Sequence, residues 1–117
     1  MGGVLTQETG RQDVLICRGA NTDWAVRWTN STDGGLTYQP VDLTGDVGKL
    51  ELRSPGGELW MTRAIVGTVD GLAGVELTPD EFTDPAWASR SGGSWLITMT
   101  HEGREERLGE GYFYLED

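Results

Sequence analysis

The feature that most constrains the fold is the order of local signals in the last third of the chain, residues 74–117. Thr78 and Pro79 mark the start of a short helical turn near residues 78–84, because a capping residue is followed by proline at the first helical position. Two stretches of alternating apolar and polar residues come next. Glu102-Gly103, a dipeptide suited to a tight hairpin turn, joins them. We therefore expect a strand, a helical turn and a hairpin, in that order.

The front of the chain also predicts short strands joined by tight turns. Residues 24–28 alternate strictly, so Trp24, Val26 and Trp28 share one face of a strand. Similar segments lie at residues 13–18, 49–53 and 58–69, with turn-forming residues between them. The 18 glycines among 117 residues agree with many turns. This pattern predicts one all-β domain, either a sandwich or a small barrel.

Charge and composition exclude several classes of partner. The formal net charge of −10 argues against nucleic acid, because contacts to phosphate need an excess of Lys and Arg. No apolar run reaches the roughly 20 residues of a membrane span, and the first residues do not resemble a signal peptide. Cys17 is the single cysteine, so an intrachain disulfide is excluded. We expect a protein made in a reducing cytoplasm, with neither nucleic acid nor a membrane as partner.

Residue types that carry catalysis or bind metals occur without a supporting pattern. The single histidine, His101, precedes the hairpin turn, where we expect a solvent-exposed side chain rather than a catalytic base. Four aspartates adjoin turns, but no Asp-x-Asp-x-Asp calcium loop is present; they are Asp42, Asp46, Asp70 and Asp80. We interpret them as turn caps. No catalytic residue, cofactor or metal is expected, and we do not expect an enzyme.

The aromatic residues support a second hypothesis. Trp24, Trp28 and Trp95 share faces with aliphatic residues and are expected in the core. The candidates for surface rings, which could stack on sugars or fill a subunit interface, are Trp60, Trp87 and Tyr112. A carbohydrate-binding module therefore stays open as an alternative, although packing in the core or at an interface is the favoured role for most of these rings.

The N-terminal residues differ from the rest of the chain. Residues 1–11 are mostly polar and lack turn chemistry, which predicts a flexible arm before a sandwich domain at residues 12–117. Val4 and Leu5 are isolated apolar residues in this arm. We expect them to contact the edge or groove of a neighbouring subunit.

Over residues 12–116 the chain resembles the small immunoglobulin-like β-sandwich domains of tailed-phage (siphophage) virion proteins, including tail collar, baseplate and fibre-docking proteins. The resemblance rests on the order and spacing of a basic-glycine pair, an aromatic alternating strand, an entry into the next strand, a helical turn and a final hairpin. In this sequence these are Arg18-Gly19, Trp24-Ala-Val-Arg-Trp28, Pro40-Val-Asp-Leu-Thr-Gly45, Leu77-Thr-Pro-Asp-Glu81 and Gly111-Tyr-Phe-Tyr114. The resemblance implies a single immunoglobulin-like β-sandwich of about eight antiparallel strands. Asp84-Pro85 should end its helix after one or two turns.

The resemblance also implies a function. We expect a non-enzymatic structural protein of the virion that acts as an adaptor of the tail, in the collar, the baseplate or as a minor tail protein. Its partners would be copies of itself, as a symmetric homo-oligomer on the particle, and other phage structural proteins of the tail tube, baseplate or capsid. A capsid decoration protein is the first alternative, and the carbohydrate-binding module is the alternative from another class.

Overall fold

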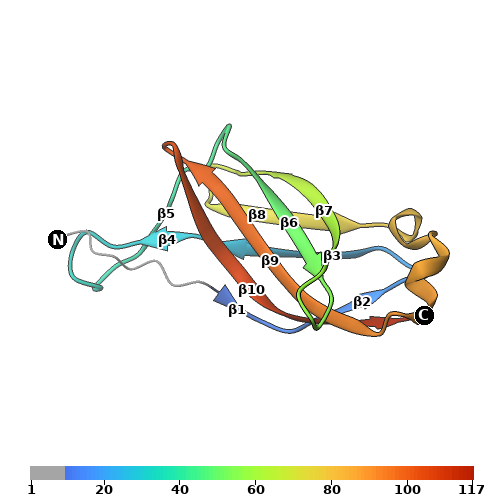
Figure 1. Cartoon of the computed structure of the whole chain (residues 1–117). Helices are drawn as coiled ribbons and strands as arrows, with labels where there is room; N and C mark the ends of the chain where they lie inside the picture. Colours follow the sequence, from blue (N-terminus) through green and yellow to red (C-terminus); the bar gives the residue numbers. More distant parts are fainter. Residues whose placement is uncertain (1–9) are drawn as a thin grey trace.

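Two layers of β-strands face each other in the computed structural model, which describes residues 10–117 (Figure 1). The larger sheet contains β1 (Gly10–Arg11), β2 (Val14–Cys17), β6 (Val47–Arg53), β7 (Leu59–Val66), β9 (Gly92–His101) and β10 (Arg104–Glu116). The smaller layer pairs β3 (Thr22–Arg27) with β8 (Leu72–Leu77). A short ribbon joins β4 (Thr29–Asn30) to β5 (Gln39–Pro40). The protein therefore has an all-β, sandwich-like fold, as expected.

The pairing in the larger sheet is only partly antiparallel. The strand order is β1-β10-β9-β6-β7, with β2 also paired to β10. Neighbours from β10 to β7 are antiparallel, whereas β1 and β2 run parallel to β10, with Val14 opposite Phe113. The expectation of antiparallel strands throughout is therefore wrong. Parallel strands need a long connection, and nearly the whole domain lies between the first strands and the last one.

The start of the sheet overlaps the expected N-terminal arm. Gly10 and Arg11, which the sequence analysis assigned to that arm, form β1 and lie opposite Gly109 and Glu110 of β10. Val4 and Leu5 lie outside the described residues.

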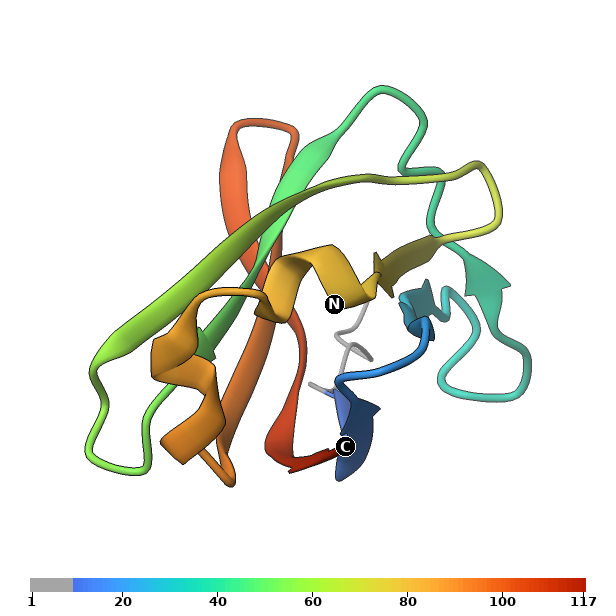
Figure 2. The ribbon, with the colours of Figure 1, turned by 90° about the vertical axis from the view of Figure 1, so that its right-hand side faces the viewer.

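Two short 3-10 helices, η1 (Pro79–Phe82) and η2 (Pro85–Ser89), connect β8 to β9. Figure 2 looks onto the end of the molecule where they lie. The Glu81 carboxylate accepts a hydrogen bond from the backbone N–H of Thr78 at 2.9 Å. This bond is part of a capping box, which stabilises the start of η1. Asp84 accepts the N–H of Ala86 at 2.9 Å and starts the second helix. The expected stop at Asp84-Pro85 is confirmed, but a second helix, which was not expected, follows it.

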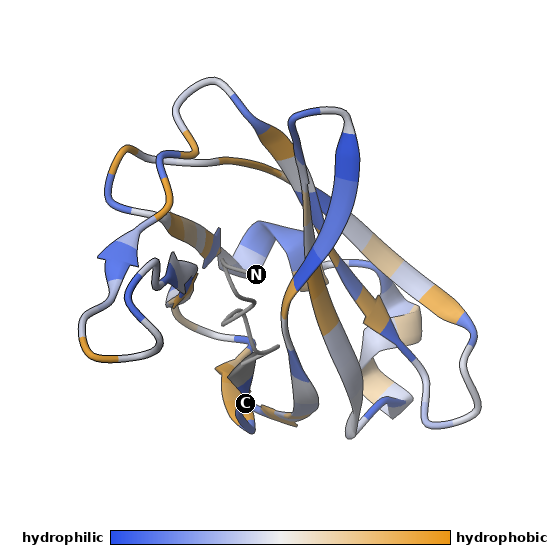
Figure 3. Cartoon of the chain, turned by 90° about the vertical axis from the view of Figure 1, so that its left-hand side faces the viewer, coloured by the Kyte–Doolittle hydropathy of each residue, from blue (hydrophilic) through white to orange (hydrophobic). Residues whose placement is uncertain are grey.

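The β9–β10 hairpin is the longest element of the fold. Glu102 and Gly103 both have positive φ, 50° and 77°, which a two-residue hairpin turn of the favoured hand requires. The hairpin end of β10 is strongly hydrophilic (Figure 3). A register shift between Arg107 and Gly109 places Leu108 in the core, where its side chain is buried. The predicted hairpin is confirmed.

The core lies between the two layers. Val26 is buried, and Trp24 and Trp28 are partly buried against the core, on one face as the alternation predicted. Leu50 and Leu52 are completely buried. The remaining completely or almost completely buried apolar side chains include Ile16, Leu43, Ile97, Met99 and Phe113. Burial of apolar surface is the main stabilising contribution to such a domain.

Candidate functional site

Two of the three rings predicted to lie at the surface do not form an open platform. Trp87 is only 5% exposed, so its assignment as a surface ring is wrong. It packs edge-to-face against Phe82 and Trp60, with ring centroids 5.0 and 5.8 Å apart. The Arg90 guanidinium lies 4.4 Å from the ring centroids of both Trp60 and Trp87, as a cation–π cover. The physical reason is the unexpected helix η2, which turns Trp87 inward.

Tyr112, the third predicted ring, is exposed on the outer face of the larger sheet. It is 51% exposed, and Tyr114, two residues further along β10 on the same face, is exposed to the same extent. A shallow groove runs beside Tyr112 across β1, β6, β9 and β10. We call it the outer groove, and its main lining residues are Arg11, Glu51, Arg53, Arg107, Glu110 and Tyr112. An adjoining hollow, lined by Pro55, Gly92 and Tyr114, shares Ser94 and Tyr112 with it.

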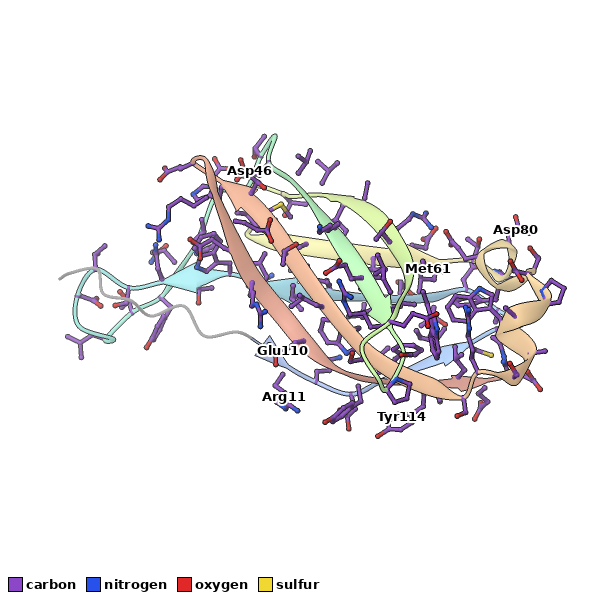
Figure 4. The ribbon with its side chains drawn as sticks, viewed as in Figure 1. Arg11, Asp46, Met61, Asp80, Glu110 and Tyr114 are labelled. Carbon is purple, nitrogen blue, oxygen red and sulfur yellow. The ribbon has the colours of Figure 1, made fainter. Side chains whose placement is uncertain are left out.

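Strand register brings the lining residues of the outer groove together. Glu110 lies opposite both Arg11 of β1 and Leu96 of β9, and Tyr112 lies opposite Ser94. Figure 4 shows Arg11 and Glu110 where β1 meets β10, and Tyr114 further along the sheet. The Arg11 guanidinium also lies 5.6 Å from the centre of the Tyr112 ring. Residues from both ends of the chain thus form one surface.

Each glutamate of the outer groove lies beneath the cations it binds. Glu110 accepts from Arg11 at 3.2 Å and lies 3.6 Å from Arg107, while Glu51 accepts from Arg53 at 3.1 Å. The Arg11 and Arg107 side chains are 62% and 66% exposed, compared with 33% for Glu110 and 11% for Glu51. The most exposed groups of the outer groove are therefore guanidinium groups and the Tyr112 ring.

The charge of the outer groove is opposite to that of the molecule. Three arginines and two glutamates give it a small formal excess of positive charge, on a chain whose net charge is −10. Sequence reasoning found Tyr112 and missed the arginines. Their positions, up to about one hundred residues apart, carry no common sequence signal.

His101 forms a structural link rather than an exposed turn. Its side chain is 20% exposed, and its Nδ1 lies 2.5 Å from the Asp46 carboxylate. The ring also packs edge-on against Trp28, at 5.2 Å between ring centroids. The expectation of a solvent-exposed residue is wrong because β9 continues through His101, which brings the ring against Trp28 and the residue preceding β6.

Of the four aspartates interpreted as turn caps, Asp42 accepts a backbone N–H, whereas Asp46 binds His101. Asp42 accepts the N–H of Thr44 at 2.9 Å, and hydrogen bonds from Thr44 lower the pKa of Asp42. Within residues 10–117, no three His, Cys, Asp or Glu side chains are grouped so that they could hold a metal ion. In the same part of the chain, the helices are too short and too polar to span a bilayer.

Comparison with models of known protein families finds no match for this sequence, and comparison with curated proteins finds none either.

Proposed function

We propose that this chain is a non-enzymatic structural adaptor of a tailed-phage virion, which docks in many copies through the outer groove. The observation that carries the proposal is a surface of arginine and tyrosine on a strongly acidic protein. The resemblance of residues 12–116 to phage sandwich domains supports a place in the tail, as a collar, baseplate or minor tail protein. A capsid decoration protein would use the same surface.

The residue types in the outer groove favour contact with a protein. Tyrosine and arginine are enriched in the energetically important centres of protein interfaces, where they combine a large contact area with directional hydrogen bonds. Glu110 and Glu51 hold the Arg11 and Arg53 side chains in place before binding. Ordering these side chains on binding therefore costs less conformational entropy.

The charge of the outer groove favours an acidic partner surface. A positive groove attracts acidic proteins, and opposite charges increase the rate of encounter. Another copy of this chain is acidic overall, since the chain carries 19 acidic and 9 basic residues. Weak contacts of this kind add up when many copies bind one particle.

The decisive test is whether the protein occurs in particles and binds them through the outer groove. We expect mass spectrometry of purified virions to detect the protein. Adding purified Tyr112→Ala to particles that lack the protein should restore at most about a tenth of wild-type occupancy, as for loss of an interface hot spot. The matched control is Tyr38→Ala, because Tyr38 is 53% exposed but lies outside the groove. Absence of the protein from virions, or equal loading of both variants, would contradict the proposal.

Carbohydrate binding is a second candidate because Tyr112 and Tyr114 present two half-exposed rings on one face of β10. Rings so placed can stack on sugar units, and Ser94 and Arg53 nearby can donate hydrogen bonds. Calorimetric titration of the isolated protein with oligosaccharides distinguishes the two candidates. Saturable binding that Tyr114→Ala abolishes, together with absence from virions, would favour the binding module.

A further inference from the structure

We propose that the free edge of β7 pairs with β7 of a second copy, antiparallel and about a two-fold axis, so that the larger sheet continues across two subunits. This inference rests on the proposed function, in which several copies act together, and names the surface through which they meet. β7 is the last strand of the larger sheet. Among the described residues, no strand pairs with the outer edge of β7. The nearest pairing on that side is a single bridge between Gly67, just after β7, and Ala73 of β8.

The edge of β7 has only part of the usual protection against pairing: one inward-pointing charge and an irregularity at its start. Exposed edge strands are normally blocked by charges, prolines, bulges or short length, because unpaired N–H and C=O groups attract another strand. β7 has eight residues and no proline. Its one charged residue, Arg63, is bound to Glu81 of η1 and lies across from Leu50, which faces the core. Residues 61–66 pair in unbroken register with β6, and the only irregularity lies at the first residues of β7.

The distribution of charge favours β7 over the other strand edges. Two copies with a net charge of −10 repel each other, so a contact forms most easily where neither copy brings acidic groups. β7 contains none of the 19 acidic residues, the Glu81 carboxylate beside it is paired with Arg63, and the strand is mostly pale to orange in Figure 3. The strands of the smaller layer contain Asp23 and Glu76, and β10 begins with Arg104-Glu-Glu-Arg107.

The side chains beside the edge fit a symmetric contact. On the outer face, β7 presents Thr62, Ala64 and Val66, which are small or β-branched and suit cross-strand packing. Val66 is 63% exposed, and its neighbour Val47 on β6 is 59% exposed. Antiparallel pairing of a strand with its own copy is compatible with two-fold symmetry. If residue i of one copy contacts residue j of the other, then residue j of the first copy contacts residue i of the second.

The test is the oligomeric state of two matched variants. Thr62→Lys adds a cation to the edge strand of each copy, and charged side chains on an edge strand oppose its pairing. Within its own subunit the new cation lies opposite Glu51. Thr100→Lys makes the same change at an exposed threonine on the same face, but on the interior strand β9. By sedimentation equilibrium we expect the wild type to approach twice its 12.8 kDa mass as concentration rises. Thr62→Lys should weaken dimerisation about tenfold or more, and Thr100→Lys should not.

Hydrogen exchange measured at low and high protein concentration locates the contact. We expect alternate amides within residues 61–66 to gain protection as the dimer forms, because only those that face the partner acquire new hydrogen bonds. A wild type that stays monomeric at millimolar concentration would overturn the inference. So would a dimer equally sensitive to both substitutions, or one without concentration-dependent protection in β7. The result is independent of particle loading by Tyr112→Ala, so failure here and failure of the proposed function can be told apart.

Discussion

At the scale of single residues, Asp33 has the most clearly defined environment outside the outer groove. Its carboxylate accepts the Ser31 hydroxyl at 2.6 Å and both the N–H and the hydroxyl of Thr37, at 3.0 and 2.5 Å. These hydrogen bonds, first from Ser31 and then from Thr37, hold the pKa of Asp33 well below its ordinary value of 3.8. Asp33 therefore organises the loop that carries Leu36, which is 85% exposed.

We expect the contribution of Asp33 to stability to depend on pH. Because its pKa is lower in the folded state, ionised Asp33 stabilises the fold above the unfolded value of about 3.8. That contribution is lost as the pH falls through the folded value. Denaturant midpoints of the wild type and Asp33→Asn should therefore differ most at neutral pH and converge in acid. Two profiles that stay parallel down to the lowest pH would show that Asp33 does not stabilise the loop through its charge.

At the scale of elements, the attachment of the first strands depends on a close approach of two backbones. A Cβ atom on Gly111 of β10 would lie 1.8 Å from the carbonyl oxygen of Gln12, between β1 and β2. The indole N–H of Trp95 donates to that same carbonyl at 2.9 Å. The parallel pairing of β1 and β2 with β10 thus requires glycine at position 111.

Gly111→Ala should therefore destabilise the protein by about 3 kcal/mol, because the backbone of the first strands must move away from β10. Gly74→Ala in β8 is the control. Its Cβ would lie 3.9 Å from Ala25, which is ordinary contact, and we expect a gain of roughly 0.5 kcal/mol from the lower entropy of the unfolded chain. Urea unfolding measures both variants. If the two variants were equally stable, the backbone at Gln12 would not lie as close to residue 111 of β10 as the structure shows.

At the scale of the whole molecule, packing rather than cross-linking holds the layers together. Cys17 is a free, partly buried cysteine, and residues 10–117 contain no cluster of potential metal ligands. The core instead combines aliphatic residues with edge-to-face aromatic pairs, such as Trp24 with Trp95 at 5.7 Å between ring centroids.

We expect thermal unfolding to be unchanged by chelator or by reductant, since neither can remove an interaction that packs this core. Melting curves recorded with and without EDTA, and with and without dithiothreitol, should coincide. A melting temperature several degrees lower in EDTA would reveal a bound cation and contradict this prediction.

Local signals were sufficient to predict most elements. The hairpin at Glu102-Gly103, the stop at Asp84-Pro85 and the buried face of residues 24–28 all follow from neighbouring residues, because turn chemistry and side-chain alternation act over a few positions. Gly34 and Gly35 adopt positive φ, 74° and 95°, which glycine readily does in a turn. The amino-acid sequence alone thus determined the all-β class and the positions of most strands.

Contacts between distant segments were decided only by the tertiary structure. The parallel pairing of β1 and β2 with β10, the burial of Trp87 beneath Arg90, and the link between His101 and Asp46 each join residues with no local relation. The outer groove is the clearest case, because Arg11 meets Tyr112 only when the two ends of the chain lie side by side. Strand alternation specifies which side chains share a face, but strand order and register depend on the free energy of packing the whole domain.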